Sequence, residues 1–390
     1  MKNFLEVKKY RLKCISPVHI GSGVVLQPFE YLYDYANSML YVPNREKWML
    51  LLDKHNLTDK FMQFLASNTD RIRRAEDSGK INIYSWLIKN DVSPKEISSV
   101  AERIIEVSPE YGRATLNAVN MGVQEANGNL YIPGSSIKGM FRTGILFATL
   151  LNDEKLVNNF SKKLSYAMNG RDRFERKKLL SNLGSEIEKE ILRKLKYDEK
   201  ESAMNDVMRG IKVSDARPVE EYNSVLVQKI DASTYAGKSK ETEKQLPLFR
   251  ECCKPGSEYE FSITLDREML KLANVKSIET VIKCAKAYTR RGLSIQKEVF
   301  AKYYPNEFEE AKGADLFLGG GTGFLQKSLW FSLCSDKNKG MEMLKLYLED
   351  NFHMHRHKQL DREISPRTLK LAKTDKKQLM GMCSLKEVQL

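Results

Sequence analysis

The chain has 390 residues, of which 64 are Lys or Arg and 51 are Asp or Glu, so its formal net charge is +13 at pH 7. Its hydrophobic content of 42% is too high for a disordered chain, and no apolar run approaches the roughly 20 residues that span a bilayer. The first ten residues break their apolar side chains with charges, which does not fit a signal peptide. We therefore expect a cytoplasmic protein with no membrane partner, whose large partner is a polyanion.

The first half of the chain predicts strands followed by helices. Alternation over 10–15 indicates a strand, two short strands over 30–42 indicate a hairpin, and a helix is expected over 135–151. Helical insertions are expected at about 51–110 and 153–208.

The second half repeats this order after a polar stretch at 237–245. Residues 258–265 alternate at period two, and a long helix is expected from Ser277 to about Tyr303. The fold class is therefore α+β, with two units built on antiparallel sheets. We place the domains at 1–235 and 246–390, the second with a glycine-rich loop.

Cysteine and histidine spacing favours neither a metal nor a cofactor. None of the six cysteines forms a C-x-x-C pair, so we expect reduced thiols, mostly in the core. His353, His355 and His357 would share one face if they lay on a strand. No carboxylate or thiolate pattern reinforces them, so a solvated or RNA-facing surface is favoured over a metal site.

The excess positive charge is uneven. Residues 155–200 contain 13 basic and 7 acidic side chains, and residues 354–390 contain 9 basic and 4 acidic ones. The first stretch has the spacing of helices. Two interpretations stay open for it: a solvated helix with i,i+4 ion pairs, or a surface that faces phosphates.

The segment 131–143 predicts an anion site at the start of a helix. Pro133 and Gly134 end a strand, and Ser135 or Ser136 can cap the helix that follows. Free N–H groups at a helix N-terminus bind phosphates, and Lys138 and Arg142, four residues apart, share a face beside it. The alternative is an ordinary capped helix with basic surface residues.

A glycine loop is the second candidate. Gly319, Gly320, Gly321, Thr322 and Gly323 are followed by Lys327. Backbone without side chains can approach a polyanion closely, and its N–H groups can form a concave nest. The spacing fits neither a nucleotide-binding P-loop nor a dinucleotide fingerprint, and the alternative is a tight turn that needs positive φ.

The third candidate is the loop 16–23, which contains His19, Gly21 and Ser22. A histidine in a loop can act as acid or base in RNA cleavage. No second group is placed by local spacing to assist it. Packing of the loop or contact with RNA is therefore favoured for His19.

Together, three motifs resemble the RAMP superfamily of CRISPR proteins: Pro17–Gly23, Ile132–Gly139 with Arg142, and the late glycine loop. The length, Gly320–Lys327 and Ile364–Leu371 are further similar to the fifth Csm subunits of type III-A effector complexes. The resemblance implies two ferredoxin-like, RRM-type units, the first carrying the helical insertions.

The resemblance also implies a function. Such a subunit caps one end of the complex, holds the 3′ part of the crRNA, and supports crRNA maturation and antiviral interference, with no catalytic site of its own. Its implied partners are crRNA and the other Csm subunits, above all the repeated RAMP backbone subunit, and an external nuclease for crRNA trimming stays open. The implied RNA-backbone contacts are His19, Gly21, Ser22, Gly134, Ser135, Ser136, Lys138, Arg142, Gly319, Gly320, Gly321, Thr322, Gly323 and Lys327.

Two rival functions stay open. One is a metal-independent endoribonuclease that processes crRNA precursors with His19 as acid or base. The other is a protein-docking module whose charge only keeps it soluble.

Overall fold

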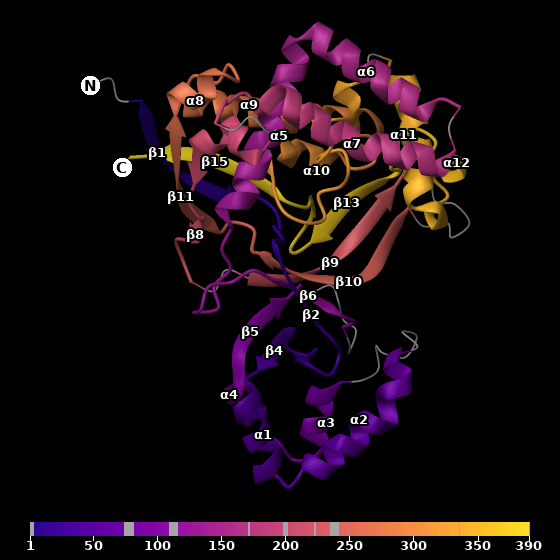
Figure 1. The fold of residues 1–390 in the computed structure, drawn as a ribbon. Coiled ribbons are helices and arrows are strands. Elements are labelled where there is room, and N and C mark those ends of the chain that lie inside the picture. The colour runs from indigo at the N-terminus through magenta and orange to yellow at the C-terminus, as the bar shows by residue number, and fades with distance from the viewer. Residues whose placement is uncertain are drawn as a thin grey trace.

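Two β-sheets form the framework of the molecule, and each draws strands from both halves of the chain (Figure 1). This computed structural model describes residues 4–73, 82–108, 116–170, 172–197, 202–221, 224–234, 242–334 and 336–389. The predicted α+β class is confirmed.

The first sheet joins the start of the chain to its end. Its described strands are β1 (Leu5–Cys14), β7 (Ile211–Val213), β8 (Arg217–Pro218), β11 (Glu258–Asp266), β12 (Leu316–Phe317) and β15 (Met382–Val388). Their order is β12-β15-β1-β11-β7, β8 also pairs with β11, and every pairing is antiparallel. Because β1 lies between β11 and β15, both termini lie at the same edge of the molecule (Figure 1).

The second sheet is mixed, which differs from the antiparallel prediction. Its described strands are β2 (Gly21–Leu26), β3 (Leu32–Asp34), β4 (Met39–Pro43), β5 (Ala101–Val107), β6 (Val119–Gly122), β9 (Ser224–Ser233), β10 (Glu243–Cys253), β13 (Thr368–Lys373) and β14 (Lys377–Leu379). β5 pairs in parallel with β9, and β6 with β10, while the other pairings are antiparallel. Parallel pairs need long crossovers, and the chain between β6 and β9, which contains α5, α6 and α7, is common to both.

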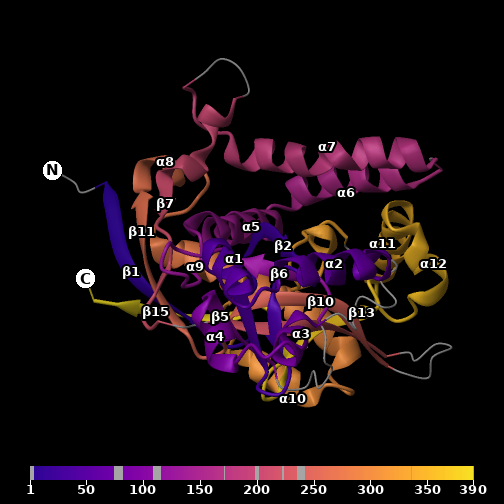
Figure 2. The same cartoon turned by 90° about the horizontal axis from the view of Figure 1, so that it is seen from below.

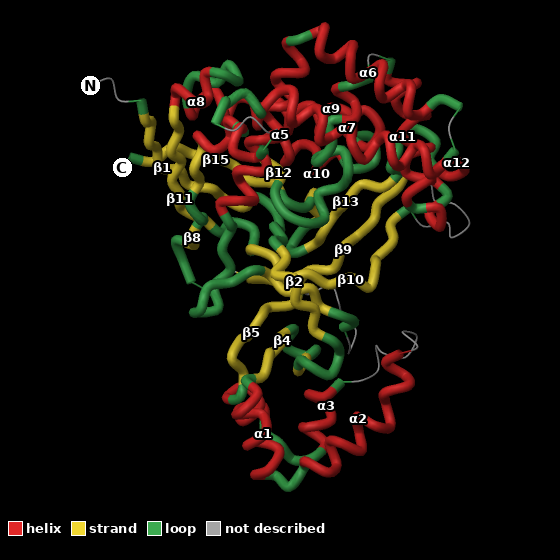
Figure 3. The backbone as a smooth tube through the Cα atoms, in the orientation of Figure 1, coloured by secondary structure: helices red, strands yellow, loops and turns green. Residues whose placement is uncertain are grey.

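A helical lobe with its own core lies at the far end from the first sheet (Figure 3). Its helices are α1 (Arg45–Lys54), α2 (Thr58–Arg73), α3 (Ile83–Lys89) and α4 (Pro94–Ser99). Trp48, Phe61, Phe64 and Trp86 pack with ring centroids 5.3 to 6.5 Å apart. The predicted insertion at 51–110 is therefore helical only in part, because its end forms β5.

The remaining helices cover the main body. They are α5 (Gly134–Asn152), α6 (Glu154–Met168), α7 (Arg173–Leu192), α8 (Arg267–Lys271), α9 (Ile278–Phe300), α10 (Pro305–Glu310), α11 (Lys337–Asn351) and α12 (His357–Leu360). α5 and α9 share the largest core with β1 and β11, and α6 and α7 form an outer layer over α5 (Figure 2). None of the described helices has the length and apolar character needed to cross a bilayer.

The predicted boundary between 235 and 246 falls partly outside the described residues. The strands on either side of it, β9 and β10, are hydrogen-bonded neighbours. The division into 1–235 and 246–390 stays a prediction.

The close crossing of α5 and α9 depends on Gly144. A Cβ atom there would lie 2.7 Å from the Cα of Ala285. We expect Gly144→Val to lower the free energy of unfolding by about 1–3 kcal/mol, because the two helices must separate to accept the side chain. Urea unfolding measures this loss.

Gly139 on the same helix is the matched control, since a Cβ atom there meets no atom within 4 Å. Gly139→Ala should raise stability by roughly 0.5–1 kcal/mol through helix propensity. Equal effects of the two substitutions would contradict the packing argument.

Candidate nucleic-acid interface

Two of the predicted loops, far apart in the sequence, meet in the structure. The Gly320 N–H donates to the carbonyl oxygen of His19 at 2.7 Å. A Cβ atom on Gly319, whose φ is +78°, would lie 2.2 Å from that same oxygen. The close approach therefore requires glycine, and the loops 16–23 and 319–323 form one surface.

The glycine loop has an alternating backbone conformation. Gly319, Gly321 and Gly323 have φ near +80 to +90°, whereas Gly320 and Thr322 do not. Alternation of this kind can turn successive N–H groups into an anion-binding concavity. At the neighbouring loop, Ser22 Oγ donates to the Met121 carbonyl at 3.1 Å.

His19 is buried beside this loop. Its Nδ1 lies 2.7 Å from the Glu251 carbonyl oxygen, and because a carbonyl only accepts, Nδ1 carries the proton. Burial lowers the pKa of His19, and the nearby Arg250 and Lys327 lower it further. The ring is therefore predominantly neutral at pH 7, with Nε2 as an acceptor.

Arg250 and Lys327 bring two positive charges close together beside the loop. The Arg250 Nη1 atom lies 2.7 Å from where a Cβ atom on Gly321 would be. Burial lowers the pKa of Lys327, with Arg250 as the second cause. Both effects disfavour the charged form of Lys327, and an anion bound beside it would stabilise that form.

A second group of cations continues along the same face of the second sheet. Lys370 on β13 and Lys229 on β9 share Asp231, at 2.8 and 3.1 Å. Burial lowers the pKa of Lys370 to about 8. A Cβ atom on Gly323 would lie 3.4 Å from Lys370 Cγ, so this group adjoins the glycine loop.

The start of α5 differs from the prediction. The helix begins at Gly134 with Pro133 as its N-cap, so neither Ser135 nor Ser136 caps it. Instead, the Gly134 N–H donates to Asp215 Oδ1 at 2.8 Å. The pairing of Ile132 with Ala216 places this carboxylate at the helix terminus, where an anion was expected.

Lys138 and Arg142 lie on α5, and Arg142 is held by two carboxylates. Arg142 Nη1 pairs with Glu188 at 2.8 Å, and Nη2 pairs with Asp206 at 2.5 Å. Burial lowers the pKa of Lys138, an effect that Asp206 opposes. Arg142 thus ties α5 to α7 and to the 3-10 turns that follow.

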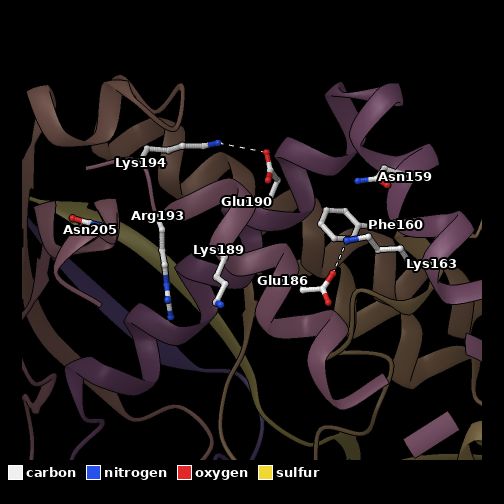
Figure 4. A pocket seen from close by; sticks show the side chains of 9 residues that line it. All are labelled: Asn159, Phe160, Lys163, Glu186, Lys189, Glu190, Arg193, Lys194 and Asn205. Carbon is white, nitrogen blue, oxygen red and sulfur yellow. Dashed lines mark hydrogen bonds and ion pairs between the residues drawn. The ribbon is translucent and has the colours of Figure 1, made fainter. Parts of the chain in front are cut away.

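The outer helices α6 and α7 enclose a polar pocket of about 420 Å³ (Figure 4). Lys163 pairs with Glu186 across the helices at 2.6 Å, and Lys194 lies 3.8 Å from Glu190. At Lys163, Glu186, Glu190 and Lys194, these ion pairs favour the interpretation of the stretch 155–200 as solvated helices.

The histidines near the C-terminus do not lie on a strand. His353 and His355 belong to a 3-10 turn, and His357 begins α12. His357 Nδ1 pairs with Asp361 at 2.8 Å, and its ring stacks with that of His355 at 5.8 Å. In the described part of the chain, no three His, Cys, Asp or Glu side chains are grouped to hold a metal ion.

Comparison with known proteins decides the family. The model of the RAMP superfamily matches residues 11–324. A protein of Streptococcus thermophilus described as "CRISPR system Cms protein Csm5" is 30% identical over 335 residues, 85% of this chain and 82% of that protein. The chain belongs to the RAMP superfamily and, within it, to the Csm5 family.

Other relatives extend over almost the whole chain. A Csm5 protein of Mycobacterium tuberculosis is 24% identical over 99% of this chain and 98% of its own length. A chain in a cryo-EM structure of a Csm-crRNA-target RNA ternary complex has a TM-score of 0.65 at 19% identity, covering 98% and 100% of the two chains. Csm5 of T. onnurineus has a TM-score of 0.58 at 18% identity, with coverage of 96% and 99%. These structures share the fold.

Sequence reasoning missed three cations of this Csm5-family chain: Lys229, Arg250 and Lys370. Each lies on a strand and points to the face covered by the glycine loop. Alternation offered a signal, because Arg250 and the buried Cys252 are two residues apart and therefore share a face. Which face the loop covers depends on pairing across the whole chain.

The interface is anchored by a buried ion pair behind it. The Glu251 carboxylate is fully buried, accepts the Gly122 N–H at 2.9 Å and contacts the Arg103 guanidinium. Burial raises the pKa of Glu251, although Arg103 opposes this. The same residue's carbonyl holds His19.

Removing Arg103 should therefore destabilise the fold strongly. We expect Arg103→Ala to cost about 3–5 kcal/mol in urea unfolding, because the carboxylate is left buried and unpaired. Without Arg103 the folded-state pKa of Glu251 rises further above its unfolded value, so stability must fall as pH rises above that unfolded value.

Arg267→Ala is the control, since Arg267 makes a half-exposed pair with Glu6 at 3.4 Å. It should cost less than about 1 kcal/mol. A loss in Arg103→Ala that is small and independent of pH would show that the buried pair does not anchor the interface.

Proposed function

We propose that this chain is a non-catalytic crRNA-binding subunit of a cytoplasmic type III-A Csm effector complex. It caps one end of the complex, holds the 3′ part of the crRNA, and supports crRNA maturation and antiviral interference. Its partners are crRNA and the other Csm subunits, above all the repeated RAMP backbone subunit. The Csm5 relatives and the Csm-crRNA-target RNA complex with the same fold support this proposal.

One observation carries the RNA-binding role: two loops converge over a cationic face. The loops 16–23 and 319–323 are joined by the Gly320–His19 hydrogen bond, Arg250 Nη1 lies against Gly321, and Lys327 is near enough to act on the charge of His19. Phosphate contacts of this kind position a nucleic acid without reading its bases.

We assign the main RNA contacts to this face, at His19, Gly21, Ser22, Gly319, Gly320, Gly321, Thr322, Gly323 and Lys327. A second contact at the start of α5 would use Ser135, Ser136 and Lys138. Contact at Gly134 or Arg142 would require RNA phosphates to compete with Asp215, Glu188 and Asp206.

We also propose that the sheets derive from two ferredoxin-like units assigned to 1–235 and 246–390. The first sheet takes β1, β7 and α5 from the first range and β11, β15 and α9 from the second, so α5 and α9 support a ferredoxin-like arrangement there but not the division between the ranges. Both helices pack on one face of the antiparallel β1–β11 pair and share its core. Two helices on one face of an antiparallel sheet are the ferredoxin-like pattern.

Reconstitution with the other Csm subunits tests the function. We expect the chain to join the complex and to protect the 3′ part of the crRNA from added nuclease, and its omission to expose that part. Lys327→Gln should weaken RNA binding and reduce the salt dependence of binding by about one phosphate contact.

Lys312→Gln is the matched control, because Lys312 is exposed and pairs with Glu309. It should leave both RNA affinity and salt dependence unchanged. A complex that protects the crRNA equally with and without this chain would refute the capping role.

The chain itself should not cleave RNA. Burial lowers the pKa of His19, and so do the cations Arg250 and Lys327. Neither cation is suited to exchange a proton with His19 at pH 7. When the purified chain is incubated with crRNA-repeat RNA in EDTA, the RNA should stay intact. The same result is expected for the His19→Ala variant. Cleavage by the native chain that His19→Ala abolishes would establish the endoribonuclease alternative instead.

A further inference from the structure

Two buried polar atoms next to the glycine loop have no hydrogen-bond partner among the described residues. They are Arg250 Nη1 and Thr322 Oγ1. Thr322 is only 4% exposed, and its chain neighbour Gly321 approaches Arg250 Nη1 directly. A buried guanidinium nitrogen without an acceptor is costly, so the pair points to a ligand that supplies acceptors.

The charge around these atoms selects an anion. The positive charges of Arg250 and Lys327 both lower the pKa of His19, and that of Arg250 also lowers the pKa of Lys327. Among the described residues, no carboxylate is one of the groups that shift His19 or Lys327. The nearest acidic side chain in the sequence, Glu251, is directed to Arg103 and the Gly122 N–H on the other face of β10.

His19 can respond to such an anion. Its Nδ1 is fixed by the Glu251 carbonyl, so only Nε2 is open to a change of role. Nε2 lies 3.2 Å from where a Cβ atom on Gly21 would be. The ring's Cδ2 lies 3.2 Å from where a Cβ atom on Gly320 would be. Glycine at both positions means that neither residue places a side chain against the ring.

We propose that Arg250, Thr322, Lys327 and His19 bind one phosphodiester group of the RNA backbone, and that His19 takes up a proton as the group binds. Arg250 Nη1 and Lys327 Nζ donate to the phosphate oxygens, as does the Thr322 hydroxyl. Protonated Nε2 becomes a fourth donor. This inference rests on the proposed RNA-binding function, and it adds Arg250 and a proton-linked His19 to that site.

The charged groups that face His19 are Arg250 from β10 and Lys327 from the segment after the glycine loop. From β2, Gly21 lies at the ring. Arg250 and Lys327 oppose the protonation of His19 until the bound phosphate neutralises their charges. RNA affinity should therefore fall as pH rises through the pKa that His19 has in the complex.

Histidine NMR of the full chain, titrated with pH, tests the site with two probes: inorganic phosphate and in-vitro-transcribed crRNA. Each should raise the pKa of His19, and Arg250→Gln should abolish the rise. Arg250→Gln should also weaken crRNA binding by about tenfold or more, since a charge-assisted hydrogen bond is lost. The thermal stability of the Arg250→Gln variant should not fall, because Arg250 Nη1 has no hydrogen-bond partner to lose among the residues that the structure describes.

Lys254→Gln is the control, because Lys254 lies just beyond the end of β10 and pairs with Glu106. It should change neither the rise in the pKa of His19 nor the affinity for crRNA. His19→Gln should flatten the pH dependence of affinity. A response to phosphate but not to crRNA would contradict the RNA-binding function while retaining the anion site. If neither probe moves the pKa of His19, or if Arg250→Gln binds crRNA like the native chain, the proposal is wrong.

Discussion

The buried carboxylate of Glu251 is the constraint on which the interface depends. Its side chain contacts Arg103 on β5 and the Gly122 N–H on β6, while its carbonyl fixes His19 in the first loop. One residue of β10 therefore sets the positions of two neighbouring segments and one loop. Since successive side chains of a strand point to opposite faces, fixing Glu251 behind the sheet presents Arg250 on the face that the glycine loop covers.

The molecule uses positive charge in two different ways. At α5 and α7, cations such as Arg142 and Lys163 are compensated by carboxylates and connect helices. Beside the glycine loop, Arg250 is partly buried and Lys327 lies close enough for its pKa to be lowered by desolvation and by Arg250. The first arrangement connects helices and stabilises the fold. In the second, the cations are not compensated in the same way and can attract an anion. A net charge of +13 does not distinguish them, although it favours the approach of RNA to either.

Local patterns predicted individual elements well and their assembly poorly. The helix expected over 135–151 is α5 (Gly134–Asn152), and the strand over 258–265 is β11. Residues 101–107 were assigned to a helical insertion, yet they form β5, because pairing with β4 and β9 overrides local preference. For the proposed site, spacing in the sequence points to the glycines and to His19, and the structure brings their loops together. The position of Arg250 beside the glycine loop could not be predicted, since it depends on β10 and the loop meeting, and capping by Asp215 likewise depends on a contact distant in sequence.

The central claim is that RNA lies on the face formed by the loops 16–23 and 319–323. The most direct measurement is photo-crosslinking of the assembled Csm complex carrying 4-thiouridine in the 3′ part of the crRNA, followed by mass spectrometry of the crosslinked peptides. The account predicts crosslinks in peptides that contain the glycine loop and the loop around His19. Crosslinks confined to α6 and α7, or none to this chain, would contradict it.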